Sequence, residues 1–572
     1  MKQYNPKDYK IVFGLPPVVS SDEVIAIDTE FAGQERKRLH RPHGTFASLQ
    51  CVLASDDKTV YIITDEKDIQ PCLDNLELGT WVFHNFLYDV RQLRRFAKIM
   101  PRKNLWDTMF MEEIMYKGYY ADFGLNHLVR RYCDIYLDKS ERATFSESDG
   151  ELTIEQAQYG ALDVIATLDV YRAQLKAVDK DDMNVWKVIE LPYIWSLMTF
   201  GGIGFDAQKW VSLNDEPKVR VKKLKEKYPG INLNSTPQVK DHLRSLGIKV
   251  SSTDAKTLSK IDNEFAQDVI KYRQYDKQIS TYGKVFAEKH QEEDGRLWTS
   301  FNPIRAITSR TSSSSPALQN IPKGEARRSC FITLDPDDKV IVVLDWSSQE
   351  PRFAAHLSQD ELLIRIFREG RDIYIATALH AYGEEITKDT KEGKARRNEL
   401  KAVVLGEFYG KTPYGLSQDL DISKEEAQKM FDLFDDAFHG YAGWADKMRR
   451  NRKREYVLTA MRRKIWTTPY ASNWDQIRVN YPIQGSASDA MKIGAYKTVI
   501  EWNKRNGLKG IGDWQSPLRL VVHDEIVSEV DKEDEVDFIE MQSRVLVEVA
   551  ESIHKGIPAA VEVYSGNSWA AK

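Results

Sequence analysis

The chain has 572 residues, of which 42% are hydrophobic and 29% charged, and its formal net charge is −5 at pH 7. This length predicts several domains, and the composition is that of a globular protein rather than a disordered one. No apolar run reaches membrane-spanning length, and the first ten residues lack a secretory signal. The scattered cysteines argue against a zinc site or a disulfide framework, so we expect a cytoplasmic protein.

The first apolar strand predicted from the sequence ends in acidic residues. Residues 24–27 are apolar and lead directly into Asp28-Thr29-Glu30. Because side chains alternate along a strand, Asp28 and Glu30 point to the same face, where they could hold one cation. A single pair of this kind is weak evidence, since solvated carboxylates are common in an acidic chain.

Two later segments carry further acidic residues on predicted helices. Residues 81–93 have the pattern of a strand followed by a helix, with Asn85 at the helix N-cap and Asp89 in the first turn. Thr153 and Gln156 predict a capping box for a second helix. On that helix, Tyr159 and Asp163 are four residues apart and share a face. We expect residues 138–150 to form a surface loop, and a charged break at residues 178–183 to end the domain.

Taken in order, these three clusters resemble the three motifs of DnaQ-like 3′–5′ proofreading exonucleases. The resemblance implies an RNase H-like domain over residues 1–183, with no room upstream for a 5′ nuclease. It also implies that Tyr159 orients the attacking water. Two divalent metals would be held by Asp28, Glu30, Asp89 and Asp163.

The middle of the chain resembles the start of the polymerase domain in family A DNA polymerases. Residues 189–206 have helical spacing that ends at two glycines, and residues 218–227 form a basic helical stretch. A basic stretch is usually a solvated helix face. Here it precedes Asn234 and Ser235, which resemble the thumb segment that follows duplex DNA, so phosphate contacts are the alternative. A thumb over residues 206–300 leaves no obvious room for a processivity-factor insertion.

Residues 299–322 are rich in serine and threonine and could form a linker. They resemble instead the family segment TGRLSSSxPNLQNIP, with Ser309 in the place of the usual glycine. The resemblance implies that primer–template DNA is contacted in the minor groove and at the primer terminus by Arg310, Gln319, Asn320 and Arg328.

The apolar run at residues 340–344 predicts a buried strand that ends on Asp345. Alone, this aspartate could simply end a strand. Residues 518–530 predict strand–turn–strand with Asp524 at the turn, and the two segments resemble polymerase motifs A and C. The resemblance implies that Asp345 and Asp524 hold two Mg²⁺ ions, for which Mn²⁺ is expected to substitute. Glu525 would support this site, and His523 would touch the primer end.

Four side chains recur every four residues along a predicted helix at 397–410: Arg397, Lys401, Leu405 and Tyr409. A basic stripe is usually a solvated face, but this one resembles motif B of the fingers. Arg397 and Lys401 would bind the incoming triphosphate, with Lys401 protonating pyrophosphate, and Tyr409 would close over the template base. Downstream, Asn480 and Gln484 would contact primer–template DNA, and the basic, aromatic-containing segment 448–464 predicts a template-strand surface.

Glu350 lies where the family keeps a glutamate under the sugar, which predicts selection of dNTPs over rNTPs and counts against a single-subunit RNA polymerase. Three neighbouring positions depart from the family pattern. Gln349 replaces an aliphatic residue, Tyr374 a histidine, and Leu405 a phenylalanine or tyrosine. Neutral drift explains such changes, and a retuned nucleotide pocket is the sharper hypothesis.

The sequence therefore predicts an α/β exonuclease domain followed by an α+β right-hand polymerase domain at residues 184–572. Within it we expect the thumb at 206–300, the palm at 301–360 and 465–572, and the fingers at 361–464. The predicted function is primer extension with dNTPs on a DNA template, with proofreading, by a monomer that binds no membrane. The missing 5′ nuclease suggests a bacteriophage replicative polymerase in the host cytoplasm. The alternatives are a repair exonuclease whose polymerase-like domain only grips DNA, and a non-enzymatic scaffold on primer–template.

Overall fold

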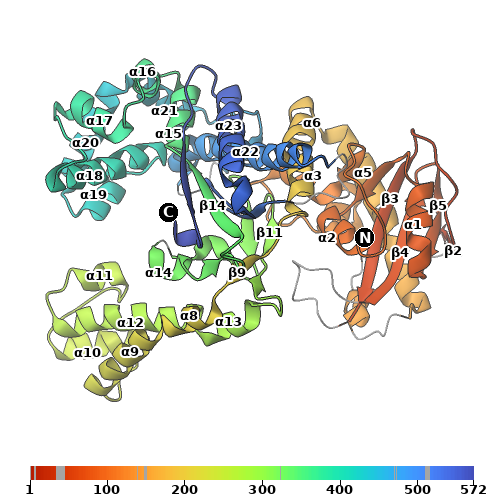
Figure 1. Cartoon of the computed structure of the whole chain (residues 1–572), viewed down its shortest axis with the longest axis horizontal. Coiled ribbons are helices and arrows are strands. Elements are labelled where there is room, and N and C mark those ends of the chain that lie inside the picture. The colour runs from red at the N-terminus through yellow and green to blue at the C-terminus, as the bar shows by residue number, and fades with distance from the viewer. Residues whose placement is uncertain are drawn as a thin grey trace.

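A computed structural model describes residues 2–4, 8–33, 45–137, 140–146, 151–322, 324–468, 471, 473–508 and 516–571. Figure 1 shows two parts, with the N-terminal part on the right and the C-terminal two thirds of the chain on the left. Within the described residues, no helix has the length and apolar character needed to cross a bilayer.

The N-terminal part is built on a six-stranded sheet with the order β2-β5-β4-β3-β6-β7. Strands β3, β4 and β5 are antiparallel neighbours, whereas β6 and β7 continue from β3 in parallel. The strands are β2 (Lys10–Phe13), β3 (Val24–Ala32), β4 (Thr45–Leu53), β5 (Asp56–Ile63), β6 (Thr80–Phe83) and β7 (Leu105–Asp107). A small pair, β1 (Lys2–Gln3) and β8 (Ile135–Tyr136), lies outside this sheet.

Helices follow the strands of this sheet, and the longest of them packs on β3 and β4. They are α1 (Ile69–Asn75), α2 (Phe86–Leu93), α3 (Thr108–Tyr116), α4 (Leu125–Cys133) and α5 (Ile154–Ala177). The predicted capping box is confirmed, because Thr153 accepts from the Gln156 amide and the Gln156 side chain accepts from the Thr153 amide.

The predicted loop at 138–150 is only partly a surface loop. Residues 138–139 and 147–150 lie outside the described part of the chain, but Ser140–Ser146 form a 3-10 helix. Phe145 in this helix is fully buried, with its ring centroid 6.1 Å from that of Tyr159. Burial of this aromatic ring explains why a polar segment is ordered there.

The link to the second part is helical rather than a loose break. The chain turns at Val178, and Asp179 caps α6 (Lys180–Val185) in a capping box with Asp182. A π-helical stretch (Trp186–Glu190) and α7 (Leu191–Leu197) continue the run, which ends before the two glycines as predicted. The charged residues at 178–183 thus cap a helix and do not form a flexible linker.

The segment predicted as the thumb forms a helical lobe in Figure 1. This lobe has a hydrophobic cluster of its own. The predicted basic helix is confirmed as α9, and Ser235 is the N-cap of α10. The elements of this region are β9 (Ile203–Phe205), α8 (Ala207–Ser212), α9 (Asp215–Lys227), α10 (Thr236–Ser245), α11 (Ala255–Ser259), α12 (Glu264–Tyr282) and α13 (Lys284–His290).

The segments predicted as the palm contain a four-stranded antiparallel sheet with the order β17-β18-β14-β19, and α23 packs on it. Its elements are β14 (Lys339–Trp346), β17 (Leu518–Val522), β18 (Glu525–Asp531), β19 (Val561–Gly566), α22 (Trp474–Arg505) and α23 (Glu535–Ile553). Short elements precede it: β10 (Arg296–Leu297), β11 (Ser300–Asn302), β12 (Ser312–Ser314), α14 (Glu325–Arg328) and β13 (Phe331–Ile332).

The segment predicted as the fingers, residues 361–464, is helical, and the predicted basic stripe lies on one helix, α18, with Tyr409 as its C-cap. Helix α15 (Gln349–Ser358), in the segment predicted as the palm, comes before it. The helices of the predicted fingers are α16 (Glu361–Arg368), α17 (Ile373–Tyr382), α18 (Lys391–Phe408), α19 (Pro413–Leu420), α20 (Lys424–Ala437) and α21 (His439–Arg450). A hairpin of β15 (Tyr456–Leu458) and β16 (Lys464–Trp466) then returns the chain to the palm.

Candidate active sites

Three of the predicted metal ligands meet on the N-terminal sheet. Asp28 and Glu30 lie on β3, and Asp163 lies on α5, which crosses this strand. One carboxylate oxygen from each residue lies within 4.8 Å of the other two. The strand alternation predicted from the sequence is therefore confirmed, and this cluster of hard oxygen donors suits a divalent cation such as Mg²⁺.

Asp89 lies beside this cluster but is held by a neighbour that sequence reasoning missed. Its Oδ1 accepts a hydrogen bond of 2.6 Å from the Thr29 hydroxyl, in the buried space between α2 and β3. Burial is the main cause that raises the pKa of Asp89, and the nearby Asp28 charge raises it further, whereas the Thr29 hydrogen bond lowers it. The fourth predicted ligand is thus electrostatically coupled to the first.

The predicted cap of α2 is replaced by another residue. Asn85 stands at the N-cap position, but it has a left-handed backbone with φ of 77° and its side chain makes no cap bond. Asp107 accepts from the Phe86 amide at 2.6 Å and also caps α3. Burial raises the pKa of Asp107 to about 7, against the effect of these amide donors. A side chain from another strand took over the cap, which local sequence could not show.

Tyr159 lies one turn before Asp163 on α5, so the two share a face as predicted. Its side chain is buried, with its ring centroid 6.1 Å from that of Phe145. The tyrosine is therefore held on the face of α5 that also carries Asp163.

The second pair of predicted carboxylates meets at the edge of the palm sheet. In the β14–β18 ladder Asp345 is opposite Glu525, which places Asp345 next to the β17–β18 turn that carries Asp524. The Trp346 amide donates to the Asp524 carbonyl at 3.4 Å, so the two aspartates belong to adjoining backbone segments. His523 at the turn is exposed and has φ of 60°. The strand–turn–strand prediction is confirmed.

Glu525 and Arg328 were predicted in separate roles, yet the structure pairs them. Arg328 Nη1 lies 3.1 Å and 3.2 Å from the two carboxylate oxygens of Glu525, and both side chains are buried. The Trp569 indole also donates to Glu525. Because these donors occupy both carboxylate oxygens, Glu525 anchors the C-terminal Trp569 to the palm behind the aspartates.

Glu350 in the first turn of α15 contacts two other predicted residues. The Arg310 guanidinium forms an ion pair with its carboxylate, and Tyr409 is hydrogen-bonded to it. Burial, and then the Glu350 charge, raise the pKa of the Tyr409 hydroxyl. One carboxylate on α15 therefore contacts both the 299–322 segment and the end of α18.

The cations of α18 face a tyrosine and an aspartate. Arg397 Nη2 lies 2.7 Å from Asp372 Oδ2, and its guanidinium carbon is 4.9 Å from the ring centroid of Tyr374. Lys401 Nζ is 5.8 Å from the same centroid. Asp372 also caps α17, as its position just before the helical pattern could have indicated. Burial raises the pKa of Tyr374 to about 12, so it is a neutral phenol near pH 7.

The other predicted DNA contacts are spread over the 299–322 segment, α22 and the start of α10. Gln319 is fixed by the Thr311 carbonyl at 2.8 Å and by the Ser313 amide, while Asn320 is exposed. Asn480 and Gln484 lie on α22. On the thumb, Asn234 donates to Asp276 at 2.9 Å. These groups form no single cluster, as expected for residues that would follow an extended polymer.

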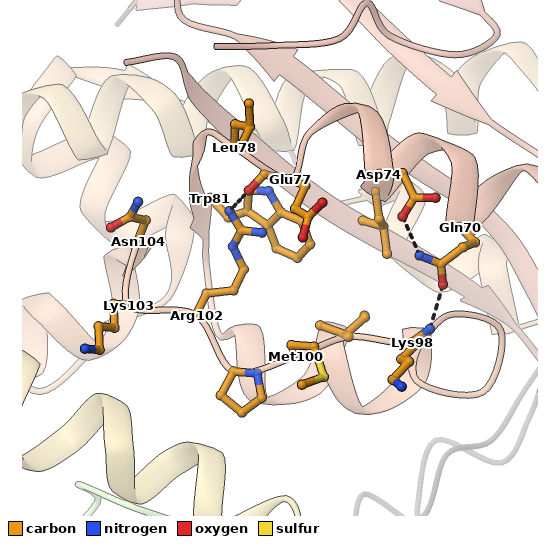
Figure 2. A pocket seen from close by; sticks show the side chains of 13 residues that line it. Gln70, Asp74, Glu77, Leu78, Trp81, Lys98, Met100, Arg102, Lys103 and Asn104 are labelled. Atoms are coloured by element: carbon orange, nitrogen blue, oxygen red, sulfur yellow. Dashed lines mark hydrogen bonds between the residues drawn. The ribbon is translucent and has the colours of Figure 1, made fainter. Parts of the chain in front are cut away.

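A depression of about 590 Å³ on the N-terminal part is separate from both carboxylate sites (Figure 2). It lies between α1 and residues 98–104, and Arg102 covers the Trp81 ring at 4.0 Å. Three of its other lining residues are linked to one another, because Gln70 is bonded to Asp74 and to the Lys98 amide. It contains none of the residues predicted to be functional.

Comparison with known proteins decides the family. Residues 209–571 match DNA polymerase family A, and residues 17–179 match the family described as 3′-5′ exonuclease. The chain belongs to DNA polymerase family A. DNA polymerase I of Bacillus subtilis (strain 168) is 30% identical over 481 residues, covering 78% of this chain and 52% of that protein. The thermostable DNA polymerase I of Thermus aquaticus is 33% identical over 333 residues, covering 56% and 38% respectively.

The fold of this family A polymerase is also found in a solved structure. The POL domain of Pol1 from M. smegmatis, in complex with DNA primer-template and dNTP, has a TM-score of 0.80 and 24% identity. The alignment covers 98% of this chain and 100% of that one, which shows that the fold is shared. The exonuclease domain followed by a right-hand polymerase domain is therefore confirmed. The chain spans about half the length of DNA polymerase I of Bacillus subtilis and of other curated relatives that it matches.

The positions at which this family A polymerase departs from the usual pattern have distinct environments. Gln349 is buried, and its Nε2 has no hydrogen-bond partner among the described residues. Leu405 is half-buried on α18. Ser309 has φ of 59°, a left-handed conformation that glycine adopts without strain, and its carbonyl accepts from Ser488 at 2.9 Å.

Proposed function

We propose that this protein is a template-directed DNA polymerase that extends a primer 3′-OH with dNTPs and removes misincorporated ends with its 3′–5′ exonuclease site. The observation that carries the proposal is the meeting of Asp345 and the Asp524 turn at one edge of the palm sheet. Both residues come from segments far apart in sequence. A shared location for two carboxylates is what a two-metal nucleotidyl transfer site requires.

The oxygen donors at both sites fit Mg²⁺, with Mn²⁺ as a substitute. Asp345 and Asp524 would hold two ions in the palm, and Asp28, Glu30, Asp89 and Asp163 would hold two in the exonuclease domain. Bound ions of this kind make the attacking oxygen more acidic and neutralise charge on the leaving group. The protein supplies rigid strand ends that keep these carboxylates in place.

The nucleotide would bind between α18 and the palm. Arg397 and Lys401 place two positive charges where a triphosphate would lie, and Lys401 would give a proton to the leaving pyrophosphate. Glu350, held by Arg310 and Tyr409, would fill the space of a 2′-OH and so select dNTPs. In the exonuclease site, Tyr159 would orient the attacking water beside Asp163.

The DNA would run along the residues predicted to contact it. Arg310, Gln319, Asn320, Asn480 and Gln484 would follow the duplex, with Arg328 and His523 near the primer end. Asn234 and Ser235 at the start of α10 would follow the backbone from the thumb. We assign the exonuclease domain to residues 1–183 and the polymerase domain to residues 184–572, with the subdomain limits predicted above.

A repair exonuclease with a DNA-gripping polymerase-like domain is the alternative, and a non-enzymatic scaffold is less favoured because both carboxylate sets are complete. Primer extension with Mg²⁺ separates them. Asp345→Asn should abolish extension and leave 3′ degradation intact, whereas extension by that variant at the wild-type rate would refute the polymerase assignment.

Four finer points stay predictions. The retuned pocket rests on Gln349, Tyr374 and Leu405. A bacteriophage source, a monomeric state and location in the host cytoplasm rest on the sequence alone, and the relatives named above are bacterial. Measuring incorporation of modified dNTPs tests the first, and the oligomeric state in solution tests one of the others.

A further inference from the structure

Five aromatic rings from the two domains meet at their junction, near α3 and α22 in Figure 1. The exonuclease domain provides three at the end of α3, and the β15–β16 hairpin provides two. Neighbouring ring centroids are between 4.8 Å and 6.5 Å apart. The rings are Tyr116, Tyr119, Tyr120, Tyr456 and Trp466. Neither carboxylate site uses them.

Trp466 is the structural centre of this group. Its indole donates to the Met115 carbonyl at 2.6 Å, its amide donates to the Lys117 carbonyl at 2.8 Å, and its ring stacks on Tyr116. These contacts explain Tyr116 and Trp466, because they join the two domains. They do not explain Tyr119, which is 57% exposed at the outer edge of the group.

Cations border the outer rings. The Arg131 guanidinium carbon lies 3.3 Å from the Tyr120 centroid, and that of Arg454 lies 4.6 Å from the Tyr456 centroid. Arg454 follows two further exposed cations, Arg452 and Lys453. Within the described part of the chain, none of these three has a carboxylate at ion-pair distance, whereas nearby Arg449, Arg450 and Arg462 do.

Helix α22 contacts the backbone of this basic segment and also the chain just after α18. Gly410, just after α18, lies so close to α22 that a Cβ there would be 2.7 Å from the Gln476 Cα. One half-turn on, Arg478 donates to the Arg454 carbonyl at 2.8 Å and to the Thr467 hydroxyl at 3.0 Å. Helix α22 therefore contacts both the chain at the end of α18 and the backbone that carries the exposed cations.

We propose that this junction surface binds the single-stranded 5′ overhang of the template ahead of the polymerase site. We define it by Tyr119, Tyr120, Tyr456, Arg452, Lys453 and Arg454. Bases stack on aromatic faces whatever their identity, and cations between the rings match the phosphates of one strand. The inference rests on the proposed function, because α18 must face the template for the path to begin there.

The test compares binding of primer–templates whose 5′ overhangs are about 2 and about 20 nucleotides long, by fluorescence anisotropy without dNTP. Tyr119→Ala should weaken binding of the long overhang about fivefold or more and leave the short one unchanged, while Tyr119→Trp should restore it. Lys453→Ala should reduce the slope of the log binding constant against log salt concentration by about one for the long overhang, and leave the slope for the short overhang unchanged. Tyr136→Ala is the matched control, since Tyr136 is 51% exposed elsewhere on the same domain.

The proposal is overturned if Tyr119→Ala binds both overhangs as tightly as wild type does. It is also overturned if Tyr119→Ala weakens binding of the short and the long overhang by the same factor. A loss confined to primers with a frayed, mismatched 3′ end would also overturn it, by assigning the surface to the primer strand. The proposed function is tested separately, because the binding assay needs no catalysis. It would be refuted if Asp345→Asn extended primers at the wild-type rate.

Discussion

Arg397 Nη2 lies 2.7 Å from Asp372 Oδ2, so the cation proposed to receive the triphosphate is already paired with a carboxylate of the fingers. Lys388 is paired with the same carboxylate at 2.9 Å. An incoming triphosphate would have to replace Asp372 at Arg397. This exchange makes Asp372 a competitor of the triphosphate for Arg397, although no motif indicated it.

Asp372→Asn should therefore tighten ground-state binding of dNTP. Asparagine keeps the cap of α17 but removes the competing charge, and a partly exposed ion pair of this kind is worth about 1 kcal/mol, or about fivefold in Kd. Pre-steady-state titration with dNTP measures it, with Asp389→Asn as a control that removes an exposed carboxylate of the same region, which accepts a hydrogen bond from the Thr387 hydroxyl. A weaker Kd in Asp372→Asn would mean that the carboxylate orients Arg397 rather than competing for it.

Glu350→Ala should admit ribonucleotides. Loss of the side chain opens the space under the sugar and leaves Arg310 without its partner, so we expect discrimination against rNTPs to fall about 10- to 100-fold. Glu350→Gln keeps the bulk and loses the charge. If Gln relaxes sugar selection as much as Ala in single-nucleotide incorporation, the ion pair and not the side-chain volume selects the sugar.

Leu405→Tyr tests the retuned pocket. A phenol on this half-buried face of α18 would supply a hydrogen bond that the leucine cannot, and one such bond is worth about 1 kcal/mol. We expect the ratio of dideoxynucleotide to deoxynucleotide incorporation to rise about fivefold or more. An unchanged ratio would leave neutral drift as the explanation, and Leu405→Met controls for altered packing.

A buried ion network within the polymerase domain joins the π-helical stretch to the β15–β16 hairpin and α22, and it should contribute strongly to the stability of that domain. Arg463 is fully buried and contacts Glu190 at 2.5 Å and Asp489 at 2.7 Å. Removing it strands buried carboxylates, so Arg463→Leu should cost about 3–5 kcal/mol in urea unfolding. The adjacent pair Arg462–Asp181 is solvent-exposed, and Arg462→Ala should cost about 0.5 kcal/mol or less. Similar costs for the two variants would contradict this account.

The palm should lose stability in acid through His554. Burial lowers its pKa to about 4, with the charges of Arg352 and His356 as lesser causes. The stabilisation is complete above the unfolded pKa of about 6.5 and is lost as the pH falls towards 4. At pH 5 the loss is about 2 kcal/mol, which His554→Gln should remove. Thermal unfolding at pH 7.5 and pH 5 measures it, with exposed His439→Gln expected to behave as wild type.

The parts of the sites that could be predicted were those with short-range patterns. Asp28 and Glu30 follow from strand alternation, the Thr153 cap from its box, and the Asp524 turn from two flanking apolar runs. What could not be predicted depends on long-range contacts. Thr29 bonded to Asp89, Asp107 capping α2, and Glu525 buried between Arg328 and Trp569 each join segments that no local pattern relates.

We propose that two independent carboxylate sites serve opposite reactions on one primer end. Extension and 3′ degradation of one 5′-labelled primer–template with Mg²⁺, measured for Asp345→Asn and Asp28→Ala side by side, separate the two sites. We expect Asp345→Asn to lose extension and keep degradation, and Asp28→Ala to lose degradation and keep extension. Full extension by Asp345→Asn, or full degradation by Asp28→Ala, would contradict it.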